Sequence, residues 1–476
     1  MKIKDKTCIV FDIEVLKNIF TCTCKNTETG VIKVFEISSR KVDIQDLLNY
    51  FTQDCYYVGY NNHHYDNPVL NYIFSLYRKR YFEFFSTREI TESIFRMSQI
   101  VIDKNSNFEL WKEYKYTKNF LSIDLLTMLF SKALRVSLKE MQVTMQYKNV
   151  EEFVVDWKQD LPEKDMDRLI SYNINDVEST EELLYRCEKL LDIRVETERD
   201  FGLPCLSLDR VNLGDKLLQL KVMQKSGLSK DQLENMKSPM DRIDLEKVIF
   251  PFIKFNTPVL QKALQDMKNQ HNVSPGRKGY INTFIFGGME VTIGVGGIHG
   301  DNGCCSIKCN EDELLLDSDV NSLYPSLIAV YELYPPKLKS ILKEVYPEII
   351  QERLEFKRTK QKNKNETYKY MLNGVTGKMQ QEVSWLYAPF SIMQVRINGQ
   401  LLLLMLAERL LDLGCKLYQI NTDGILYKIK KDKYDKLQQV LKEWEELTKL
   451  TLETEQFTSF YQLAINDYFG VESDGN

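Results

Sequence analysis

The chain has 476 residues, 43% of them hydrophobic and 28% charged, and a formal net charge of −5. Because a single core stops growing near about 250 to 300 residues, this length predicts about two to four domains of a globular protein. The longest apolar run, 401–407, is too short to cross a bilayer, so no membrane partner is expected. The N-terminus lacks the apolar stretch of a signal peptide, which predicts a cytoplasmic protein.

Charge is unevenly distributed along the chain. The window 353–378 carries a net charge of +6, whereas the rest of the chain sums to −11. A basic segment in an acidic chain is typical of a phosphate-binding patch on an enzyme that uses carboxylates. A solvated lysine-rich helix gives the same pattern, so the window alone does not decide between the two.

The ten cysteines predict reduced thiols rather than a disulfide framework, because most have apolar neighbours. Three of them lie close together in the sequence near a histidine, and this group consists of Cys304, Cys305, Cys309 and His299. The group lacks the paired C-x-x-C spacing of a zinc site, so the sequence does not favour zinc.

The predicted elements follow one another in chain order. Residues 8–15, 20–24 and 31–37 have the pattern of strands, and 162–193 has apolar residues at helical spacing, so a mixed α/β first domain is expected. Glycines and prolines interrupt the helical pattern of 201–241, which indicates a connecting region. Later predictions are strands within 276–303 and at 314–320, two basic helices within 348–378, an apolar helix at 400–413 and a hairpin at 416–429.

A first group of candidate catalytic residues begins in the first strand. Asp12 and Glu14 lie two apart, so the pleat points both carboxylates to one face of the sheet. Two neighbouring hard oxygen donors are what a magnesium ion requires. Alternate acids also occur on half-exposed strands that bind no metal, so this pair alone decides nothing.

Further acidic and phenolic residues follow at suggestive positions. Asp66 precedes an apolar segment that predicts a helix, and Tyr172 and Asp176 lie one helical turn apart. Asp124 is another carboxylate at the end of a predicted strand. Asp66 and Asp176, together with the first pair, would hold two metal ions about 4 Å apart, with Tyr172 orienting the water that attacks a phosphodiester.

These segments resemble the D-x-E, N-x-x-x-F/Y-D and Y-x-x-x-D motifs of the proofreading DEDDy 3′–5′ exonucleases. Tyr65 stands where phenylalanine is commoner. The resemblance implies that Asn61 contacts DNA. It also implies that five residues are catalytic, the four acids among them as metal ligands: Asp12, Glu14, Asp66, Tyr172 and Asp176.

A second group begins after the apolar strand at 314–316. The segment Asp319-Val-Asn-Ser-Leu-Tyr-Pro-Ser326 resembles motif A, D-x-x-S-L-Y-P-S, of the family B DNA polymerases. The resemblance implies a metal site at Asp319 and Val320. It also implies nucleotide contacts from Ser322, Leu323 and Tyr324. The bulky ring of Tyr324 would reject ribonucleotides by collision with the 2′-hydroxyl.

The basic window contains pairs of polar residues at helical spacing. Lys369 and Asn373 lie one turn apart, as Arg353 and Lys357 do one helix earlier, and such groups suit triphosphate binding. The segment 369–377 is similar to motif B, K-x-x-x-N-S-x-Y-G, although Gly374 replaces the serine and Thr376 the tyrosine. The resemblance implies that Arg353, Lys357, Lys369 and Asn373 bind the nucleotide. It also implies that Gly377 and Lys378 contact DNA.

The hairpin predicted at 416–429 carries Asn421-Thr-Asp423-Gly, which resembles motif C, D-T-D-S. Taken alone, Thr-Asp-Gly indicates an ordinary β-turn. By resemblance Asp423 is the second catalytic metal ligand, with Asn421 in place of the first aspartate. Two further segments resemble family elements that contact DNA. Residues 294–300 resemble a Y-x-G-G element, which implies DNA contacts by Gly296 and Gly297. Residues 466–468 resemble the K-x-Y region, which implies a DNA contact by Tyr468.

The resemblance implies an RNase H-like exonuclease domain followed by a right-hand polymerase palm with short helical fingers and a reduced or absent thumb. The expected segments are 1–195 (exonuclease), 196–313 (linking region), 314–340 (palm, motif A), 341–377 (fingers), 378–460 (palm, motif C) and 461–476 (residual thumb). Implied cofactors are two Mg²⁺ or Mn²⁺ ions per active site. Implied partners are primer-template DNA, deoxynucleoside triphosphates and a second polypeptide that supplies the thumb.

The compact organisation predicts a bacteriophage or plasmid polymerase that copies DNA and proofreads the product. Two other interpretations remain open at this point. One is an active exonuclease whose polymerase half is inert or needs a second polypeptide. The other is a DNA-binding module without enzymatic activity, against which the complete sets of carboxylates argue.

Overall fold

The computed structural model describes residues 1–476 except 117–118, 131–133, 135, 277–278 and 473–476. The internal contacts divide the chain into two compact units. Unit 1 consists of Met1–Leu213 with Gln361–Thr367, and unit 2 consists of Gly214–Lys360 with Tyr368–Asn476. The prediction of a mixed α/β multidomain protein is thereby confirmed, whereas its finer division into six segments stays a prediction.

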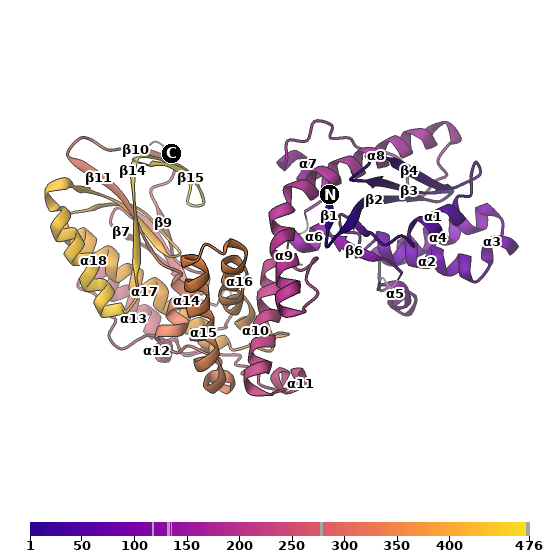
Figure 1. Ribbon diagram of the computed structural model, residues 1–476. Helices are drawn as coiled ribbons and strands as arrows, with labels where there is room; N and C mark the ends of the chain where they lie inside the picture. Colours follow the sequence, from indigo (N-terminus) through magenta and orange to yellow (C-terminus); the bar gives the residue numbers. More distant parts are fainter. Residues whose placement is uncertain (117–118, 131–133, 135, 277–278, 473–476) are drawn as a thin grey trace. The chain divides into compact units, whose positions relative to one another are not determined.

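Unit 1 is built on a mixed sheet covered by helices, drawn from indigo to magenta in Figure 1. Its strands are β1 (Lys2–Ile3), β2 (Lys6–Leu16), β3 (Ile19–Asn26), β4 (Ile32–Ile37), β5 (Tyr56–Gly59) and β6 (Leu121–Asp124). Its helices are α1 (Ile44–Tyr50), α2 (Asp66–Arg78), α3 (Tyr81–Phe84), α4 (Thr87–Ile102), α5 (Phe108–Tyr114), α6 (Leu125–Leu129), α7 (Leu138–Thr144), α8 (Glu163–Arg186) and α9 (Glu188–Phe201).

The strand order of this sheet is β4-β3-β2-β5-β6, with β1 paired to β2. β3 and β4 run antiparallel to their neighbours, whereas β2, β5 and β6 are mutually parallel. Carboxyl ends of parallel strands meet at one edge of a sheet. The segments that follow β5 and β6 therefore emerge beside the end of β2, where Asp12 and Glu14 lie.

The two faces of the sheet build two separate cores. Ile9, Phe11 and Ile13 of β2 pack into a cluster with α1, α2 and α4, whereas Cys8 and Val10 join a cluster with α6, α8 and α9. Because side chains alternate along a strand, the even-numbered acids of β2 lie on the second face. This is the face against which α8 packs.

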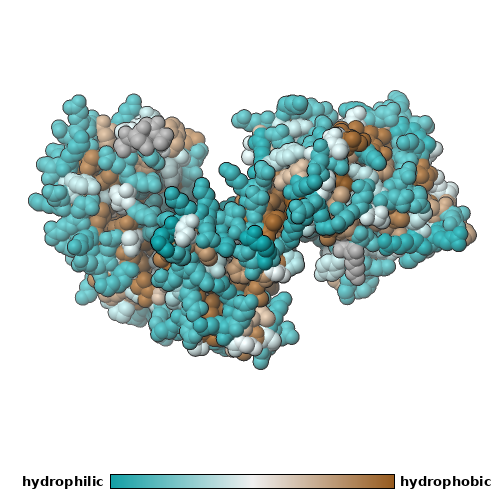
Figure 2. Space-filling view, in the orientation of Figure 1, coloured by the Kyte–Doolittle hydropathy of each residue, from teal (hydrophilic) through white to brown (hydrophobic). Residues whose placement is uncertain are grey.

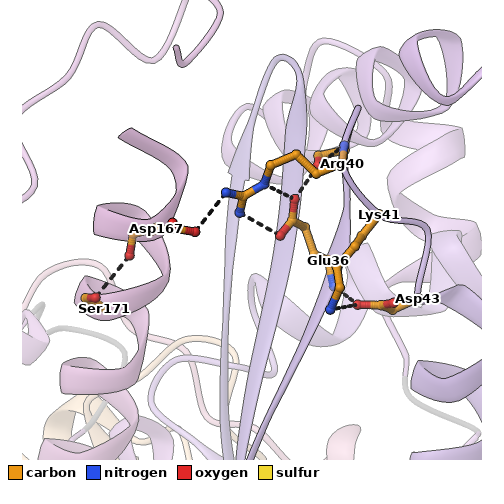
Figure 3. Close-up of polar contacts among 7 residues, drawn as sticks. Glu36, Arg40, Lys41, Asp43, Asp167 and Ser171 are labelled. Atoms are coloured by element: carbon orange, nitrogen blue, oxygen red, sulfur yellow. Dashed lines mark hydrogen bonds and ion pairs between the residues drawn. The ribbon is translucent and has the colours of Figure 1, made fainter. Parts of the chain in front are cut away.

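An ion-pair network ties α8 to the edge of the sheet, as Figure 3 shows. Arg40 donates hydrogen bonds to both carboxylate oxygens of Glu36 on β4, at 3.0 and 2.8 Å, and to Asp167 of α8 at 2.8 Å. Glu36 is buried, and its carboxylate is compensated by this guanidinium. Burial alone would raise the pKa of Glu36, but the hydrogen bonds from Arg40 and Ser38 outweigh it and lower the pKa.

Unit 2 contains the remaining elements, drawn from magenta to yellow in Figure 1. Its strands are β7 (Ile281–Phe286), β8 (Met289–Gly294), β9 (His299–Asp301), β10 (Cys305–Lys308), β11 (Glu313–Val320), β12 (Lys416–Asn421), β13 (Gly424–Lys430), β14 (Leu452–Ala464) and β15 (Asp467–Glu472). Its helices are α11 (Lys230–Glu234), α12 (Leu245–Val248), α13 (Pro258–Lys268), α14 (Leu323–Val330), α15 (Lys339–Arg358), α17 (Pro389–Leu413) and α18 (Tyr434–Thr448), with short 3₁₀ turns η1 (Pro336–Leu338) and η2 (Lys431–Lys433). Most of α10 (Arg210–Ser226) and α16 (Lys362–Met379) also belongs to unit 2.

The sheet of unit 2 has the order β10-β14-β11-β13-β12-β9-β8-β7, with β15 paired to β14, and all pairs are antiparallel. One face of β11 carries Leu315 into a cluster with Leu426 and Phe460. Asp317 and Asp319 follow Leu315 on the same face at period two. The strand therefore begins in the core and ends in carboxylates.

Helix α17 is the central helix of unit 2 and packs against α14, α18, β12 and β13. By length and composition it could cross a membrane, because it extends well beyond the apolar run seen in the sequence. However, 83% of its apolar window is buried inside the protein, which is typical of a core helix. The visible surface of both units is mostly hydrophilic in Figure 2.

Candidate functional site

The acids predicted for the first site come together in unit 1. Asp12 and Glu14 lie on β2 and Asp176 on α8, and one carboxylate oxygen of each lies within 4.8 Å of those of the other two. α8 reaches the even-numbered face of β2 because its buried side chains, Val177 among them, pack into the same cluster as Cys8 and Val10. Packing of α8 on β2 thus brings together three ligand groups, although Asp12 and Asp176 are more than 160 positions apart in the sequence.

Asp66 lies beside this trio and is fixed by the backbone. It is the first residue of α2 and is buried, and its Oδ1 accepts a hydrogen bond from the N–H of Ile13 at 3.1 Å. The strand residue between Asp12 and Glu14 therefore anchors the fourth predicted acid. Acidic groups are also favourable in the first turn of a helix, where the helix dipole is positive.

Burial and the nearby carboxylates disfavour ionisation of Asp12, Glu14 and Asp66. Burial, followed by the charges of Asp176 and Asp66, raises the pKa of Glu14 to about 8. Burial raises the pKa of Asp66 to about 7, and burial together with Asp66, Glu14 and Asp176 raises that of Asp12. Like charges held this close need a counter-ion. The donor set of hard oxygens therefore fits Mg²⁺ or Mn²⁺.

Tyr172 lies on α8 one turn before Asp176, as the sequence predicted. Burial and the nearby carboxylates, Asp176 first, raise the pKa of its phenol. Its ring contacts Phe153 with 5.7 Å between the centroids, and the ammonium of Lys139 lies 4.4 Å from its ring centre. The phenol is therefore neutral at physiological pH and is able to donate or accept a hydrogen bond.

Sequence reasoning missed three residues that hold this cluster. Lys139 Nζ pairs with Asp176 Oδ1 at 2.5 Å, and Gln142 Nε2 donates to the same oxygen at 3.1 Å. Asn173 Nδ2 donates to Asp12 Oδ2 at 2.6 Å. Lys139 and Gln142 come from α7, and no pattern in the sequence around α7 predicts that it packs against α8. Only Asn173, next to Tyr172, lay within reach of motif reasoning.

Asn61 lies in the loop that follows β5, and Asp124 is the last residue of β6 and the N-cap of α6. Asn61 has a left-handed φ of 61°, and its N–H donates to Asp124 Oδ1 at 3.0 Å. Asp124 also accepts the N–H groups of His63 and Leu126 at 3.1 and 3.0 Å. Its carboxylate therefore fixes the turn that leads to Asp66 and is not one of the clustered metal ligands.

The second predicted site lies at the end of β11 in unit 2. Asp319 pairs in register with Gly424, the residue after Asp423, and the N–H of Val320 donates to the carbonyl of Asp423 at 2.8 Å. A Cβ atom added to Gly424 would lie 1.5 Å from Asp319 Oδ1. Glycine at this position therefore leaves the space that the Asp319 carboxylate occupies beside the motif C turn.

The structure adds three acids to this second site. Asp317 and Asp319 pair in register with Glu455 and Glu453 of β14. Burial and the charges of Asp423, Glu455 and Glu453 raise the pKa of Asp319 to about 6, and burial with Asp319 raises that of Asp317 to about 7. The site thus has a dense set of oxygen donors that fits divalent cations, although none of its trios is as tight as the one in unit 1 among the described residues.

The residues after Asp319 are split between the core and the surface. The side chains of Val320 and Leu323 are buried, so only their backbone atoms are available to a ligand. Ser322 has a left-handed φ of 50°, and Arg353 of α15 donates to its hydroxyl at 3.4 Å. The ring of Tyr324 packs over Gly399 of α17, where an added Cβ atom would lie 3.8 Å from its edge.

The predicted cations of α15 and α16 have different surroundings. Lys357, Lys369 and Asn373 are exposed, the last two on one face of α16. Lys378 is buried, and its ammonium pairs with Asp215 at 3.3 Å. Its DNA contact therefore stays a prediction that this pairing does not favour. Gly377 precedes it in the last turn of α16.

The remaining predicted DNA contacts lie around the motif C hairpin. Gly296 is exposed and Gly297 has a φ of 132°, so the backbone there is open to close approach. Asn421 Nδ2 donates to Asn466 Oδ1 at 3.2 Å, which links the two asparagines that replace charged family residues. Tyr468 stacks on Phe460 with 4.9 Å between the ring centroids, and burial and Asp317 raise the pKa of its phenol.

Two other groups of potential metal ligands have simpler explanations. Asp244, Glu246 and His271 lie close together, but Asp244 already caps α12 and contacts His271 Nδ1 at 3.0 Å. The cysteines near His299 are free thiols and form no ligand trio with it within the described residues.

Comparison with solved structures identifies the class of fold. 242 solved chains match this one, whereas no family model and no curated protein matches it. The fold is similar to that of a family B DNA polymerase. The structure that carries this likeness is the family B DNA polymerase from the hyperthermophilic archaeon Pyrobaculum calidifontis, with a TM-score of 0.53 and 16% sequence identity. The match covers 99% of this chain and 59% of that polymerase, so this chain spans about three fifths of its length.

Proposed function

We propose that the chain is a DNA-directed DNA polymerase that also carries a 3′–5′ exonuclease site for proofreading. The observation that carries the proposal is the register of β11 and β13, which sets Asp319 against the turn of Asp423 within a family B polymerase fold. Unit 1 would be the RNase H-like exonuclease and unit 2 the palm and fingers. Primer-template DNA and deoxynucleoside triphosphates are the substrates of this proposal.

In unit 2, the residues of the chain would bind and orient the nucleotide. Asp319 and Asp423 would hold two divalent cations, which supply Lewis-acid stabilisation of the developing charge. Arg353, Lys357 and Lys369 would neutralise the triphosphate as pyrophosphate leaves. The Tyr324 ring, held against α17, would exclude a 2′-hydroxyl by collision.

In unit 1, the four acids would hold divalent cations at the scissile phosphodiester. The neutral phenol of Tyr172 would accept a hydrogen bond from the attacking water and orient it. Lys139 and Asn173 would position Asp176 and Asp12 through the contacts described above. The close approach of Asp12, Glu14 and Asp176 supports a second candidate function, an exonuclease that trims DNA without synthesis.

Primer extension with Mg²⁺ tests both candidates. Reactions with and without nucleotides should show extension and degradation, respectively. Asp319→Ala should abolish only extension, and Asp12→Ala only degradation. Exposed acids of the same units provide matched controls, and Asp312→Ala and Asp54→Ala should leave both activities unchanged.

Failure of the unmutated protein to extend a primer, with degradation intact, would leave the exonuclease as the function. Loss of neither activity in Asp319→Ala and Asp12→Ala would overturn both candidates. A second polypeptide that completes the thumb, the cytoplasmic location and the bacteriophage origin stay predictions from the sequence.

A further inference from the structure

Unit 1 contains a groove that the proposed chemistry does not use. It has a volume of about 1030 Å³ and runs beside β6, the last strand of the sheet. Its described lining contains Lys104, Trp111, Lys115 and Tyr116, and none of the four clustered acids. The groove is therefore a separate feature of the exonuclease unit.

Aromatic rings and ammonium groups alternate along this lining. Lys104 and Lys115 lie over the ring of Trp111, at 5.1 and 4.8 Å from its centre, and Lys115 also lies 4.5 Å from the ring centre of Tyr116. Trp111 is half-buried, whereas the Tyr116 side chain is 66% exposed. Trp111 thus holds two cations in place, and Tyr116 offers an open ring face.

The groove is positively charged, because its described lining contains three lysines and one carboxylate, and only one of the lysines pairs with that carboxylate. Within the described residues, neither Lys104 nor Lys115 takes part in an ion pair. Glu109 and Glu113 of α5 line a different depression, together with Lys112. Among the described lining residues Glu198 is the one acid, and it pairs with Lys4.

The fold fixes the aromatic segment and sets one end of the groove near the predicted DNA contact. Asn71 of α2 donates to the backbone carbonyls of Tyr114 and Tyr116 at 3.0 and 3.1 Å, which anchors the chain on both sides of Lys115. His63 and His64 also line the groove. They belong to the loop that begins with Asn61 and leads to Asp66.

We propose that this groove binds single-stranded DNA, with an unpaired base stacked on Tyr116 and phosphates held by Lys104 and Lys115. Exposed ring faces between cations are the chemistry of single-strand binding, because only unpaired bases can offer their faces to a side chain. Duplex DNA would satisfy the lysines but not the ring. The proposal rests on the proposed function in one respect, namely that DNA is the substrate.

The test measures binding of a fluorescent oligothymidylate to the full chain by anisotropy, in EDTA so that the DNA stays intact. Tyr116→Ala should weaken binding about tenfold, and Tyr116→Phe, which keeps the ring, should restore it. Lys104→Glu with Lys115→Glu should weaken binding and lower the salt dependence by about one to two released ions. The controls are Tyr81→Ala, a 40% exposed tyrosine of unit 1, and Lys112→Glu on the other side of α5.

Equal losses in Lys112→Glu and in the groove lysines would overturn the proposal, because bulk charge alone would then explain the binding. Unchanged binding in Tyr116→Ala, or an equal loss for blunt duplex DNA, would overturn it as well. The same variants assayed for primer extension separate the two levels of inference. If the unmutated protein extends a primer but the groove variants bind oligothymidylate normally, the groove proposal is refuted and the polymerase proposal stands.

Discussion

At the scale of single residues, the raised pKa values of unit 1 predict how metal affects stability. A carboxyl whose pKa is raised by folding contributes stability that is fully present below its unfolded pKa and is lost as pH rises through its folded pKa. For Glu14 and Asp66 the folded values are about 8 and about 7. In EDTA the protein should therefore lose stability between pH 5 and pH 8.5, and Mg²⁺ should restore it.

Denaturant unfolding at several pH values measures this effect. Glu14→Gln should reduce the loss in EDTA by at least about 1 kcal/mol, because one pKa unit corresponds to about 1.4 kcal/mol. Asp54→Asn, at an exposed acid of the same unit, should leave the pH profile unchanged. Because both variants lie in unit 1, the comparison separates its acids from those of unit 2. If Glu14→Gln does not alter the dependence of stability on pH, repulsion among the buried carboxylates is refuted as its cause.

A second prediction at this scale concerns Gly424, where motif C of the family has serine. Gly424→Ser restores the family residue, yet its Cβ atom would lie 1.5 Å from Asp319 Oδ1. The carboxylate can rotate away, so the protein should still fold. Primer extension should nevertheless fall about 100-fold, the usual effect of misplacing a reacting group by about 1 Å.

The exonuclease rate of Gly424→Ser should remain unchanged, which a single-turnover degradation assay would show. Gly276→Ser is the matched control, because the nearest atom to its added Cβ is a side-chain oxygen at 3.7 Å. Full extension activity in Gly424→Ser would mean that Asp319 does not depend on this space.

At the scale of elements, the ion-pair network between β4 and α8 should stabilise the exonuclease site. Arg40→Met leaves the buried carboxylate of Glu36 without its cation, which should cost about 3 kcal/mol of unfolding free energy. It also releases Asp167 of α8, so degradation of DNA should slow. Arg186→Met removes an exposed pair with Glu182 and should cost less than about 0.5 kcal/mol.

Unfolding monitored by circular dichroism checks this difference. The double variant Glu36→Gln with Arg40→Met should recover part of the loss, because the buried charge is then removed with its partner. Equal costs for Arg40→Met and Arg186→Met would show that the network is no more than a surface ion pair.

At the scale of the whole molecule, two units with separate cores predict unfolding in more than one step. The chain exceeds the size at which a single core grows, and each unit buries its own hydrophobic clusters. Calorimetry should give a total enthalpy larger than the van't Hoff enthalpy. Arg40→Met, in unit 1, should lower only one of the transitions, and a single transition shifted as a whole would contradict this expectation.

The sequence by itself determined the local part of the site. Period two along β2 fixed that Asp12 and Glu14 share a face, and helical spacing did the same for Tyr172 and Asp176. Motif order indicated the polymerase fold. These inferences succeed because strand and helix periods are properties of neighbouring residues.

Only the tertiary structure decided which distant groups complete each site. Glu453 and Glu455 reach the second site because β14 pairs with β11, and Lys139 reaches the first because α7 packs beside α8. Lys378 looked like a surface cation in its basic helix but is buried against Asp215. Such contacts depend on burial and on long-range strand pairing, and neither leaves a period in the local sequence.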